Sequence, residues 1–194
     1  EMKAWGPRYL TGTKVSRLDA FDKVTGRAKY TYDINLPGML YGRILRSPHP
    51  HAKVIRVDLS RAFAHPGVKA VLDFEKKTVR YAGEEVAAVA AVSAEIADEA
   101  LQLINVTYET LSFSVVEEKS MILGAMEIHP RGNVEIRKSR QKEQGDFKAG
   151  LARSDKTIEA TYRVPVQTHN SLEVHGSVAR WEGENLTVWC STQG

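Results

Sequence analysis

The feature of this sequence that most constrains its fold is a short apolar run followed at once by an amphipathic segment. The run at 86–92 contains only Val and Ala, which is typical of a strand covered on both faces. Ser93 then stands at a helix N-cap position, and the residues after it place their apolar side chains on one helical face. A strand at 105–108 follows. This strand–helix–strand order predicts two parallel strands joined by a right-handed crossover.

Most of the remaining sequence has the pattern of β-structure. Alternating apolar residues with β-branched and aromatic side chains predict strands at 24–32, 40–46, 53–58, 68–74, 157–164, 172–181 and 186–192. A turn is predicted at 36–39, a stiff proline loop at 47–51 and a hairpin turn at 182–185. Ser60 is expected to cap a short helix at 61–64. The fold class is therefore α+β, with strands dominating and one clear helix.

Changes in composition along the chain predict four regions. Residues 1–22 are polar and contain turn formers, so we expect an N-terminal arm. Residues 23–125 hold most of the predicted strands and the clear helix, and they form the first domain. Residues 126–150 include a basic stretch with few large apolar side chains, which is typical of a linker. Residues 151–194 begin a second domain.

The composition excludes several classes of protein. The 194 residues carry 27 Lys and Arg against 24 Asp and Glu, a net charge of +3. Because the basic stretch at 131–148 contains a single aromatic residue, Phe147, at its end and none interleaved among its basic residues before that, we expect no nucleic-acid binding. The longest apolar run is too short to cross a bilayer, so we expect no membrane contact. No Arg-rich or hydrophobic leader is visible in the sequence, so we expect no export signal.

Cysteine usage narrows the chemistry further. The single cysteine, Cys190, excludes an internal disulfide, a cysteine-ligated zinc ribbon or an iron–sulfur cluster held by this chain alone. It falls in a predicted strand with no obvious base beside it, so we expect a small buried side chain and not a nucleophile. A lone thiol suits the cytoplasm, and a periplasmic location is left open. The sequence also lacks the glycine-rich patterns that bind nucleotides.

Two groups of histidines could in principle hold a metal ion. His169, Glu173 and His175 would share one face of an extended strand, and they are adequate ligands for zinc or iron. They would, however, be spaced by up to about 20 Å along a straight strand, so we favour buried, hydrogen-bonded polar residues. His49 and His51 lie between prolines and are better interpreted as part of a rigid loop.

Several stretches, taken together, resemble the molybdenum-binding subunit of the xanthine dehydrogenase and aldehyde oxidase family, the molybdenum hydroxylases. In chain order they read DKVTGRAKY at 22–30, LPGMLYG at 36–42, RSPHPHA at 46–52, PGVKAVL at 66–72, VRYAGEEVAAV at 79–89, QTHNSLE at 167–173 and STQ at 191–193. The resemblance implies an α/β hammerhead domain over 23–125, followed by the first strands of a molybdopterin-binding domain. It differs from the family in one place, where the connection between 72–74 and 79–81 is shorter than usual.

The resemblance also implies a site residue and a set of partners. The Gln of the Ser-Thr-Gln motif, here Gln193, is expected to donate a hydrogen bond to an oxygen ligand of molybdenum, a sensible role for an amide N–H. Glu173 is expected to be a buried structural carboxylate near the site and not the catalytic base. No residue of this chain is assigned as catalytic or as a metal ligand. The base and the substrate pocket are expected in the remainder of the subunit, and 2Fe–2S and FAD groups on partner subunits.

From the resemblance we expect a fragment or subunit of a molybdenum-dependent hydroxylase that oxidises aldehydes or N-heterocycles and is inactive alone. The alternative is a non-catalytic interaction module that kept the hammerhead fold. A further alternative is a metalloprotein that uses His169, Glu173 and His175.

Overall fold

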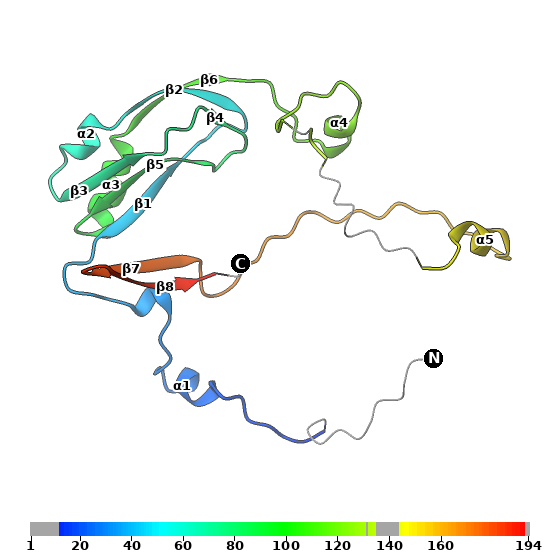
Figure 1. Ribbon diagram of the computed structural model, residues 1–194, viewed down its shortest axis with the longest axis horizontal. Coiled ribbons are helices and arrows are strands. Elements are labelled where there is room, and N and C mark those ends of the chain that lie inside the picture. Colours follow the sequence, from blue (N-terminus) through cyan, green and yellow to red (C-terminus); the bar gives the residue numbers. More distant parts are fainter. Residues whose placement is uncertain (1–11, 131, 135–143, 193–194) are drawn as a thin grey trace. The chain divides into compact units, whose positions relative to one another are not determined.

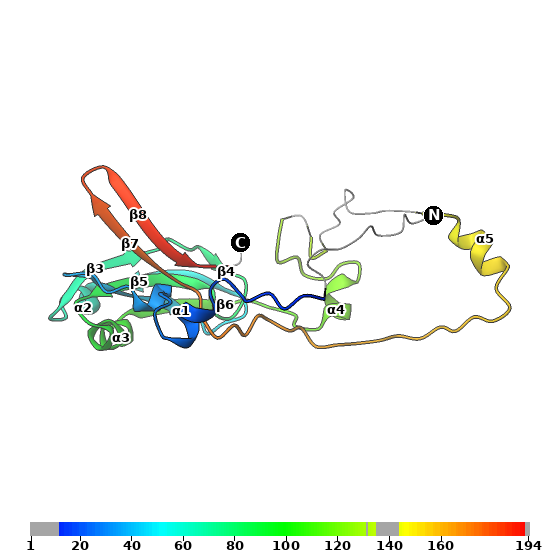
Figure 2. The same cartoon turned by 90° about the horizontal axis from the view of Figure 1, so that it is seen from below.

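The computed structural model of the protein describes residues 12–130, 132–134 and 144–192. Its internal contacts divide the chain into two compact units. The central unit is Gly38–Thr161, and the terminal unit combines Glu1–Pro37 with Tyr162–Gly194. Figures 1 and 2 show the elements of both units, with the strands in the blue-green part of the chain and a separate hairpin near its end.

The central unit contains two three-stranded antiparallel sheets. In one, β5 (Glu85–Ala91) lies between β1 (Tyr41–Arg46) and β3 (Val68–Asp73); in the other, β2 (Ala52–Asp58) lies between β4 (Thr78–Val79) and β6 (Asn105–Thr110). Helices α2 (Ser60–Phe63) and α3 (Ala94–Gln102) accompany the first sheet, while α4 (Glu117–Met121) and α5 (Phe147–Ala152) follow later in the chain. The predicted α+β class is confirmed.

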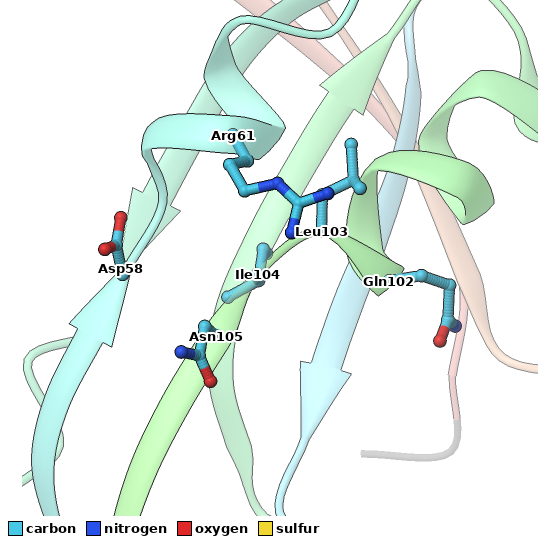
Figure 3. Close-up of a pocket in the computed structure, with 6 residues that line it drawn as sticks. All are labelled: Asp58, Arg61, Gln102, Leu103, Ile104 and Asn105. Carbon is cyan, nitrogen blue, oxygen red and sulfur yellow. The ribbon is translucent and has the colours of Figure 1, made fainter.

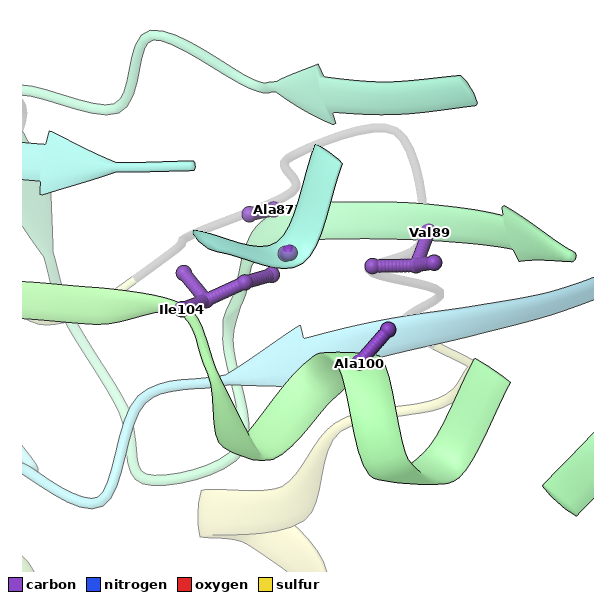
Figure 4. Packing of buried hydrophobic residues seen from close by; sticks show 5 residues of the cluster. Ala87, Val89, Ala100 and Ile104 are labelled. Carbon is purple, nitrogen blue, oxygen red and sulfur yellow. The ribbon is translucent and has the colours of Figure 1, made fainter. Parts of the chain in front are cut away.

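The apolar run at 86–92 forms most of β5, the central strand of the first sheet, so the predicted strand is confirmed. Ala87 and Val89 of β5 point to one side, where they meet Ala100 of α3, Ile104 and Ala62 of α2 in the main core (Figure 4). Val86 packs on the opposite side into a second cluster with residues of β2 and β4. Ala88 and Ala90 are only partly buried. The strand is therefore fully covered on one face and partly covered on the other.

Helix α3 forms as the sequence predicts. The Ser93 hydroxyl accepts a hydrogen bond from the Ile96 amide at 3.3 Å, and Ser93 itself has an extended conformation. This satisfies one of the amide groups that a helix start leaves without an intrahelical partner. Ala97 and Ala100 are buried, and Asp98 on the outer side pairs with Arg43 of β1 at 2.7 Å. The helix is thus fixed to the sheet by its small apolar face and by an ion pair at its edge.

The predicted parallel crossover is wrong. Strand β6 does not join β5 but pairs with β2 in the other sheet, and all the pairings in the described part of the chain are antiparallel. The order of elements along the chain was right, but it does not specify which sheet the second strand enters. Pairing with β2 puts Val57 opposite Val106, and both side chains pack against buried clusters.

The connections of the central unit follow their turn residues closely. Residues 47–51 form a loop without regular structure, as the two prolines predict. The short helix was predicted to be capped by Ser60, but it begins at Ser60 itself. The carboxylate of Asp58 instead accepts hydrogen bonds from the Ser60 amide at 3.1 Å and from its hydroxyl at 2.6 Å. Gly67 then turns the chain at a positive φ of 89°, close against the side chain of Ile96.

The terminal unit has less regular structure than predicted. Residues 24–32 were expected to form a strand, but the structure has helix α1 (Ala20–Val24) and the 3-10 helix η1 (Thr31–Asp33). No strand forms at 157–164 either, a segment that crosses from the central unit into the terminal unit. β-branched residues favour strands only where a neighbouring strand can pair with them, and neither segment has one among the described residues.

The predicted hairpin is confirmed, although its first strand is shorter than expected. Strand β7 (Gly176–Glu182) pairs with β8 (Asn185–Ser191), with Glu182 opposite Asn185 across a two-residue turn. Gly183 in that turn has a φ of 61°, the left-handed conformation that a tight hairpin turn requires. Cys190 lies in β8, as predicted, but it is exposed. The expectation of burial is wrong because no described residue of the terminal unit covers this face of the two-stranded ribbon.

Candidate functional site

The residue expected to contact the cofactor, Gln193, lies outside the described residues. The structure does describe the two residues before it, Ser191 at the end of β8 and Thr192. The Ser-Thr-Gln motif therefore begins at the open end of the β7–β8 hairpin, opposite its tight turn. The assignment of Gln193 as the contact residue stays a prediction.

A set of hydrogen bonds fastens this end of the hairpin to the segment before β7. The Ser191 hydroxyl donates to the Val174 carbonyl at 2.8 Å and accepts from the Gly176 amide at 3.0 Å. One residue before Val174, the Glu173 carboxylate accepts a hydrogen bond from the Thr31 amide of η1 at 3.3 Å. Residues distant in sequence are thus joined at the point where the motif begins.

Glu173 itself is exposed, so the expectation of a buried carboxylate is wrong for this chain. The reason is local: residues 161–175 run without strand pairing, and the strand predicted from 172 starts only at Gly176. The carboxylate has a structural partner in the Thr31 amide, which sequence reasoning did not find. Neither residue stands in a pattern that points to the other, so the sequence carries no signal from which this pair could have been predicted.

The histidine-based metal sites are not supported by the geometry. His169 and His175 are both exposed and lie in the segment that does not form the predicted strand. Throughout the described ranges, no group of three or more His, Cys, Asp or Glu side chains is placed to hold a metal ion. His51 instead contacts the Ser112 carbonyl at 2.7 Å through Nδ1. Both groups therefore behave as polar residues of loops.

A buried polar cluster in the central unit escaped the sequence analysis. Glu84 and Ser47 are 5% and 3% exposed, and the Ser47 amide donates to the Glu84 carbonyl at 2.8 Å. The Glu84 carboxylate accepts from the Arg80 amide at 2.6 Å and pairs with Lys76 at 3.3 Å. These partners belong to neighbouring loops. The cluster therefore holds together the loops around the start of β5. The sequence feature that could have predicted it is a Glu directly before a buried strand.

The aromatic contact beside this cluster fixes the proline loop. The rings of His49 and Tyr108 meet edge to face with their centres 4.9 Å apart. Burial raises the pKa of the Tyr108 phenol above its usual value, and a hydrogen bond with the Ser47 side chain partly opposes that rise. The ring contact and the Ser47 hydrogen bond together hold the proline loop against β6. This agrees with the prediction of a rigid loop at 47–51.

The central unit also has a surface pocket of about 290 Å³ (Figure 3). Arg61 reaches from α2 toward Leu103 at the end of α3, as Figure 3 shows. The lining residues are Asp58, Arg61, Gln102, Leu103, Ile104 and Asn105. None of them belongs to the motifs that carry the family resemblance, and Asp58 is already engaged by Ser60. The family resemblance therefore assigns this pocket no role.

The hydrogen-bond donors near the Ser-Thr-Gln motif could contact a pterin–metal group, but they could not coordinate its metal. The segment at 167–171 offers exposed amide, hydroxyl and imidazole groups, which can hydrogen-bond to a polar ligand. No described trio of side chains could coordinate a metal directly. This donor set suits hydrogen bonds to oxygen atoms of a group that brings its own metal. The fit is therefore to outer contacts and not to ligation.

Two family profiles match the chain in sequence order. The one described as "Aldehyde oxidase and xanthine dehydrogenase, a/b hammerhead domain" matches residues 25–76 and 73–112, and the "Molybdopterin cofactor-binding domain" matches residues 128–194. The two hammerhead stretches meet at 73–76, in the connection that is expected to be short. There the Asp73 carboxylate accepts a hydrogen bond from the Glu75 amide at 2.7 Å, and Glu75 has a φ of 53°.

Individual proteins match nearly the whole chain. It is 36% identical over 91% of its length to a Bacillus subtilis protein named as a probable subunit of xanthine dehydrogenase, of which it spans 26%. It is 33% identical over 95% of its length to the nicotinate dehydrogenase large molybdopterin subunit of Eubacterium barkeri, of which it spans 48%. The structure of quinoline 2-oxidoreductase from Pseudomonas putida 86 matches 94% of the chain with a TM-score of 0.81 and 28% identity, and the chain spans 27% of that structure.

The chain thus spans between a quarter and a half of these relatives. Hammerhead and molybdopterin-domain profiles occur in the order that the motifs predicted, and a solved member of the group has the same fold. The chain belongs to the xanthine dehydrogenase and aldehyde oxidase family of molybdenum hydroxylases, as a part of its molybdenum-binding large subunit.

Proposed function

We propose that this chain acts as part of a molybdenum-dependent hydroxylase that oxidises aldehydes or N-heterocycles with oxygen derived from water. The observation that carries the proposal is the placement of the Ser-Thr-Gln motif. It begins at the last residue of β8, and β8 lies inside the stretch that matches the molybdopterin cofactor-binding domain. Relatives named as xanthine dehydrogenase and nicotinate dehydrogenase subunits agree with this reaction class.

The role of the chain in that reaction is to bind and orient. The bound molybdenum centre would supply the two-electron oxidation. Gln193 would donate its amide N–H to an oxygen atom of that centre, because an amide is a donor and a metal-bound oxygen is an acceptor. The exposed donors at 167–171 are the further candidates for contacts to the cofactor. We assign no proton-transfer or nucleophilic role to a residue of this chain.

The exposed side of the hairpin supports a requirement for further polypeptide. Alternate residues of paired strands share a face, and the register places five apolar side chains together on one side of the ribbon. These residues, which we call the hairpin apolar face, are Ala179, Trp181, Leu186, Val188 and Cys190. A two-stranded ribbon is marginally stable by itself. We therefore propose that the remainder of the molybdenum-binding subunit covers this face and that the chain alone is inactive.

The same proposal includes electron-transfer partners. With one cysteine, this chain cannot by itself supply the four cysteine ligands of a 2Fe–2S cluster. We propose that 2Fe–2S and FAD groups reside on partner subunits and that the assembly is cytoplasmic. We also retain the predicted domain limits, with the hammerhead at 23–125 and the cofactor-binding domain starting at 151.

Affinity purification of the tagged chain from its native source tests the proposal. We expect molybdenum, measured by elemental analysis, and the pterin, measured by its fluorescence after oxidation, to co-purify with the chain. Val188→Asp places a charge on the hairpin apolar face and should abolish this co-purification. Thr187→Asp, on the other face of the same strand, should retain it. If neither the unmodified chain nor the Thr187→Asp variant carried molybdenum although both were folded, the proposal would be refuted.

A second candidate function is a non-catalytic interaction module. It is favoured by one observation: the buried residues of the described chain all lie in the central unit, which has its own core. In that case the purified complex would contain a partner protein but no molybdenum. The elemental analysis therefore separates the two functions directly.

No helix in the described ranges is long and apolar enough to cross a membrane.

A further inference from the structure

The chain between the two matched domains contains a loop whose apolar side chains are exposed. The hammerhead profile ends at residue 112 and the cofactor-binding profile begins at 128, so residues 121–126 belong to neither match. This segment, which we call the linker apolar loop, begins at the last residue of α4 (Figure 1). Leu123 at its tip is fully exposed, and Met121 and Ile122 are 66% and 64% exposed. Adjacent apolar side chains on a surface indicate a contact site.

One side chain fixes the shape of this loop. The Asn133 carboxamide donates to the Ser120 carbonyl at 3.0 Å and to the Met126 carbonyl at 2.8 Å, at the two ends of the loop. Its oxygen accepts from the Ile128 amide at 2.9 Å. Gly124 turns the tip with a positive φ of 81°. Both donors and the acceptor of the carboxamide are thus used, and the apolar side chains are presented by a loop that is already held in shape.

The loop is also anchored to the buried part of the central unit. The Arg80 side chain donates from Nε to the Ile128 carbonyl at 3.2 Å, and the Arg80 amide donates to the Glu84 carboxylate at 2.6 Å. Glu84 is one of the buried polar residues around the start of β5. The linker apolar loop is therefore connected by hydrogen bonds to the polar cluster beside the central strand.

We propose that the linker apolar loop inserts Leu123 into an aliphatic pocket on the remainder of the molybdenum-binding subunit. The inference rests on the proposed function, because it takes that remainder as the partner. The chain spans 26% and 48% of two relatives, which therefore contain a large amount of further polypeptide. Permanent interfaces are more apolar than transient ones. A loop that Asn133 already holds in shape also loses less conformational entropy when it docks.

The composition of the loop argues against a membrane surface as its occupant. Residues 120–130 contain no Lys or Arg, whereas segments that bind anionic lipid surfaces are basic. The same residues contain no Trp or Tyr, the side chains typical of membrane interfaces. Glu127 adds a negative charge directly beside the loop. A protein pocket lined by aliphatic side chains fits this composition better.

Photo-cross-linking in the complex purified from its native source identifies what the loop touches. Leu123→benzoylphenylalanine places a photoreactive group at the tip, and mass spectrometry identifies the joined peptide. We expect a peptide from sequence that aligns with the part of the relatives which this chain does not span. The control, Asp155→benzoylphenylalanine at another exposed site, should not yield that peptide. A peptide from a partner subunit or a second copy of this chain, a lipid adduct, no product, or the same peptide from the control would overturn the proposal.

A charge at the tip measures how much the contact contributes. Leu123→Asp should lower the amount of the remainder that co-purifies with the tagged chain at least about tenfold, because an aliphatic pocket leaves a carboxylate without a partner. Lys119→Asp changes the charge of exposed α4 but keeps every apolar side chain, so the yield should change less than about twofold. Circular dichroism should show that both variants are folded. An unchanged yield for Leu123→Asp, or equal losses for the two variants, would contradict the proposal.

The preformed shape of the loop is tested in the chain itself. Asn133→Ala removes the acceptor of the Ile128 amide, whose deuterium exchange, followed by NMR, should become about ten times faster. Asn105→Ala, at an exposed position in β6 of the same unit, should leave that exchange unchanged. Asn133→Ala should also lower the co-purified remainder, because ordering the loop then opposes binding. Unchanged exchange in Asn133→Ala would show that this side chain does not hold the loop.

Molybdenum content keeps this inference distinct from the proposed function. If the complex carries molybdenum but the cross-link from position 123 leads elsewhere, the docking proposal fails and the proposed function stands. If the cross-link leads to the remainder of the subunit and elemental analysis finds no molybdenum, the docking contact stands and the proposed function fails.

Discussion

The two units of this chain differ in how they bury apolar side chains. In the described part of the central unit, ten apolar residues are buried, and a single strand supplies four of them: Val86, Ala87, Val89 and Ala91. In the terminal unit none of the described residues is buried, although its hairpin is regularly paired and has two tryptophans. Regular hydrogen bonding thus does not by itself make a core. The difference indicates that the central unit has a core of its own, while the hairpin leaves an apolar face exposed among the described residues.

The sharpest way to break this comparison is to place the same charge in both units. Val89 is 2% exposed and Val188 is 51% exposed. Val89→Asp buries an unpaired carboxylate and should destabilise the central unit by about 4 kcal/mol or more, which removes its cooperative unfolding transition. Val188→Asp should change the free energy of unfolding by less than about 0.5 kcal/mol. Circular dichroism during thermal unfolding measures both. Equal losses would show that the hairpin has a core of its own.

A smaller effect is expected at the turn where helix and sheet approach most closely. A Cβ on Gly67 would lie 2.9 Å from Cδ1 of Ile96. Gly67 also has a φ of 89°, a backbone conformation that disfavours any L side chain. Gly67→Ala should therefore cost about 2–3 kcal/mol in unfolding free energy. Gly38 has a φ of 73° but no atom within 4 Å of an added Cβ, so Gly38→Ala should cost only about 1 kcal/mol. Urea titration distinguishes the two, and equal costs would contradict a packing contribution at Gly67.

The N-cap of α3 contributes less again. Ser93→Ala leaves the Ile96 amide without its side-chain acceptor and should lower the unfolding free energy by about 1 kcal/mol. Ser93→Gly lets water reach the same amide and should cost a few tenths of a kcal/mol relative to the unmodified chain. Equilibrium unfolding in urea measures both variants. If alanine and glycine were equally destabilising, loss of the cap would not be the cause.

The smallest expected effect is on the stability of the fold at low pH. Hydrogen bonds from the Ser60 side chain and backbone amide hold the pKa of Asp58 below its usual value. Because the folded pKa is lowered, this carboxylate stabilises the fold above the unfolded pKa of about 4, and the stabilisation disappears as the pH falls through the folded pKa. Asp58→Asn should therefore flatten the decline of Tm below a pH of about 4. Asp155→Asn, at an exposed site outside the helices and strands, serves as the control and should keep the original slope.

Sequence reasoning succeeded where the information was local. The Ser93 cap, the buried strand β5 and the two-residue hairpin turn each depend on residues within a few positions of one another. The contacts of the candidate site were harder to predict from the sequence. The motif resemblance identified the Ser-Thr-Gln stretch, but the bonds from Ser191 to Val174 and from Thr31 to Glu173 join residues up to 142 positions apart. No periodicity encodes such pairs.

By itself, the sequence determined the family, the order of elements, the position of the main helix and the apolar character of the central strand, because these follow from motif order and from spacing along the chain. Only the tertiary structure decided that β6 joins β2 and not β5, that 24–32 does not form a strand, and that Cys190 and Glu173 are exposed. Strand pairing and burial depend on what a segment meets in space. The same kind of apolar side chain is part of a core in β5 and exposed in β8, because α3 covers the first and no described residue of its own unit covers the second.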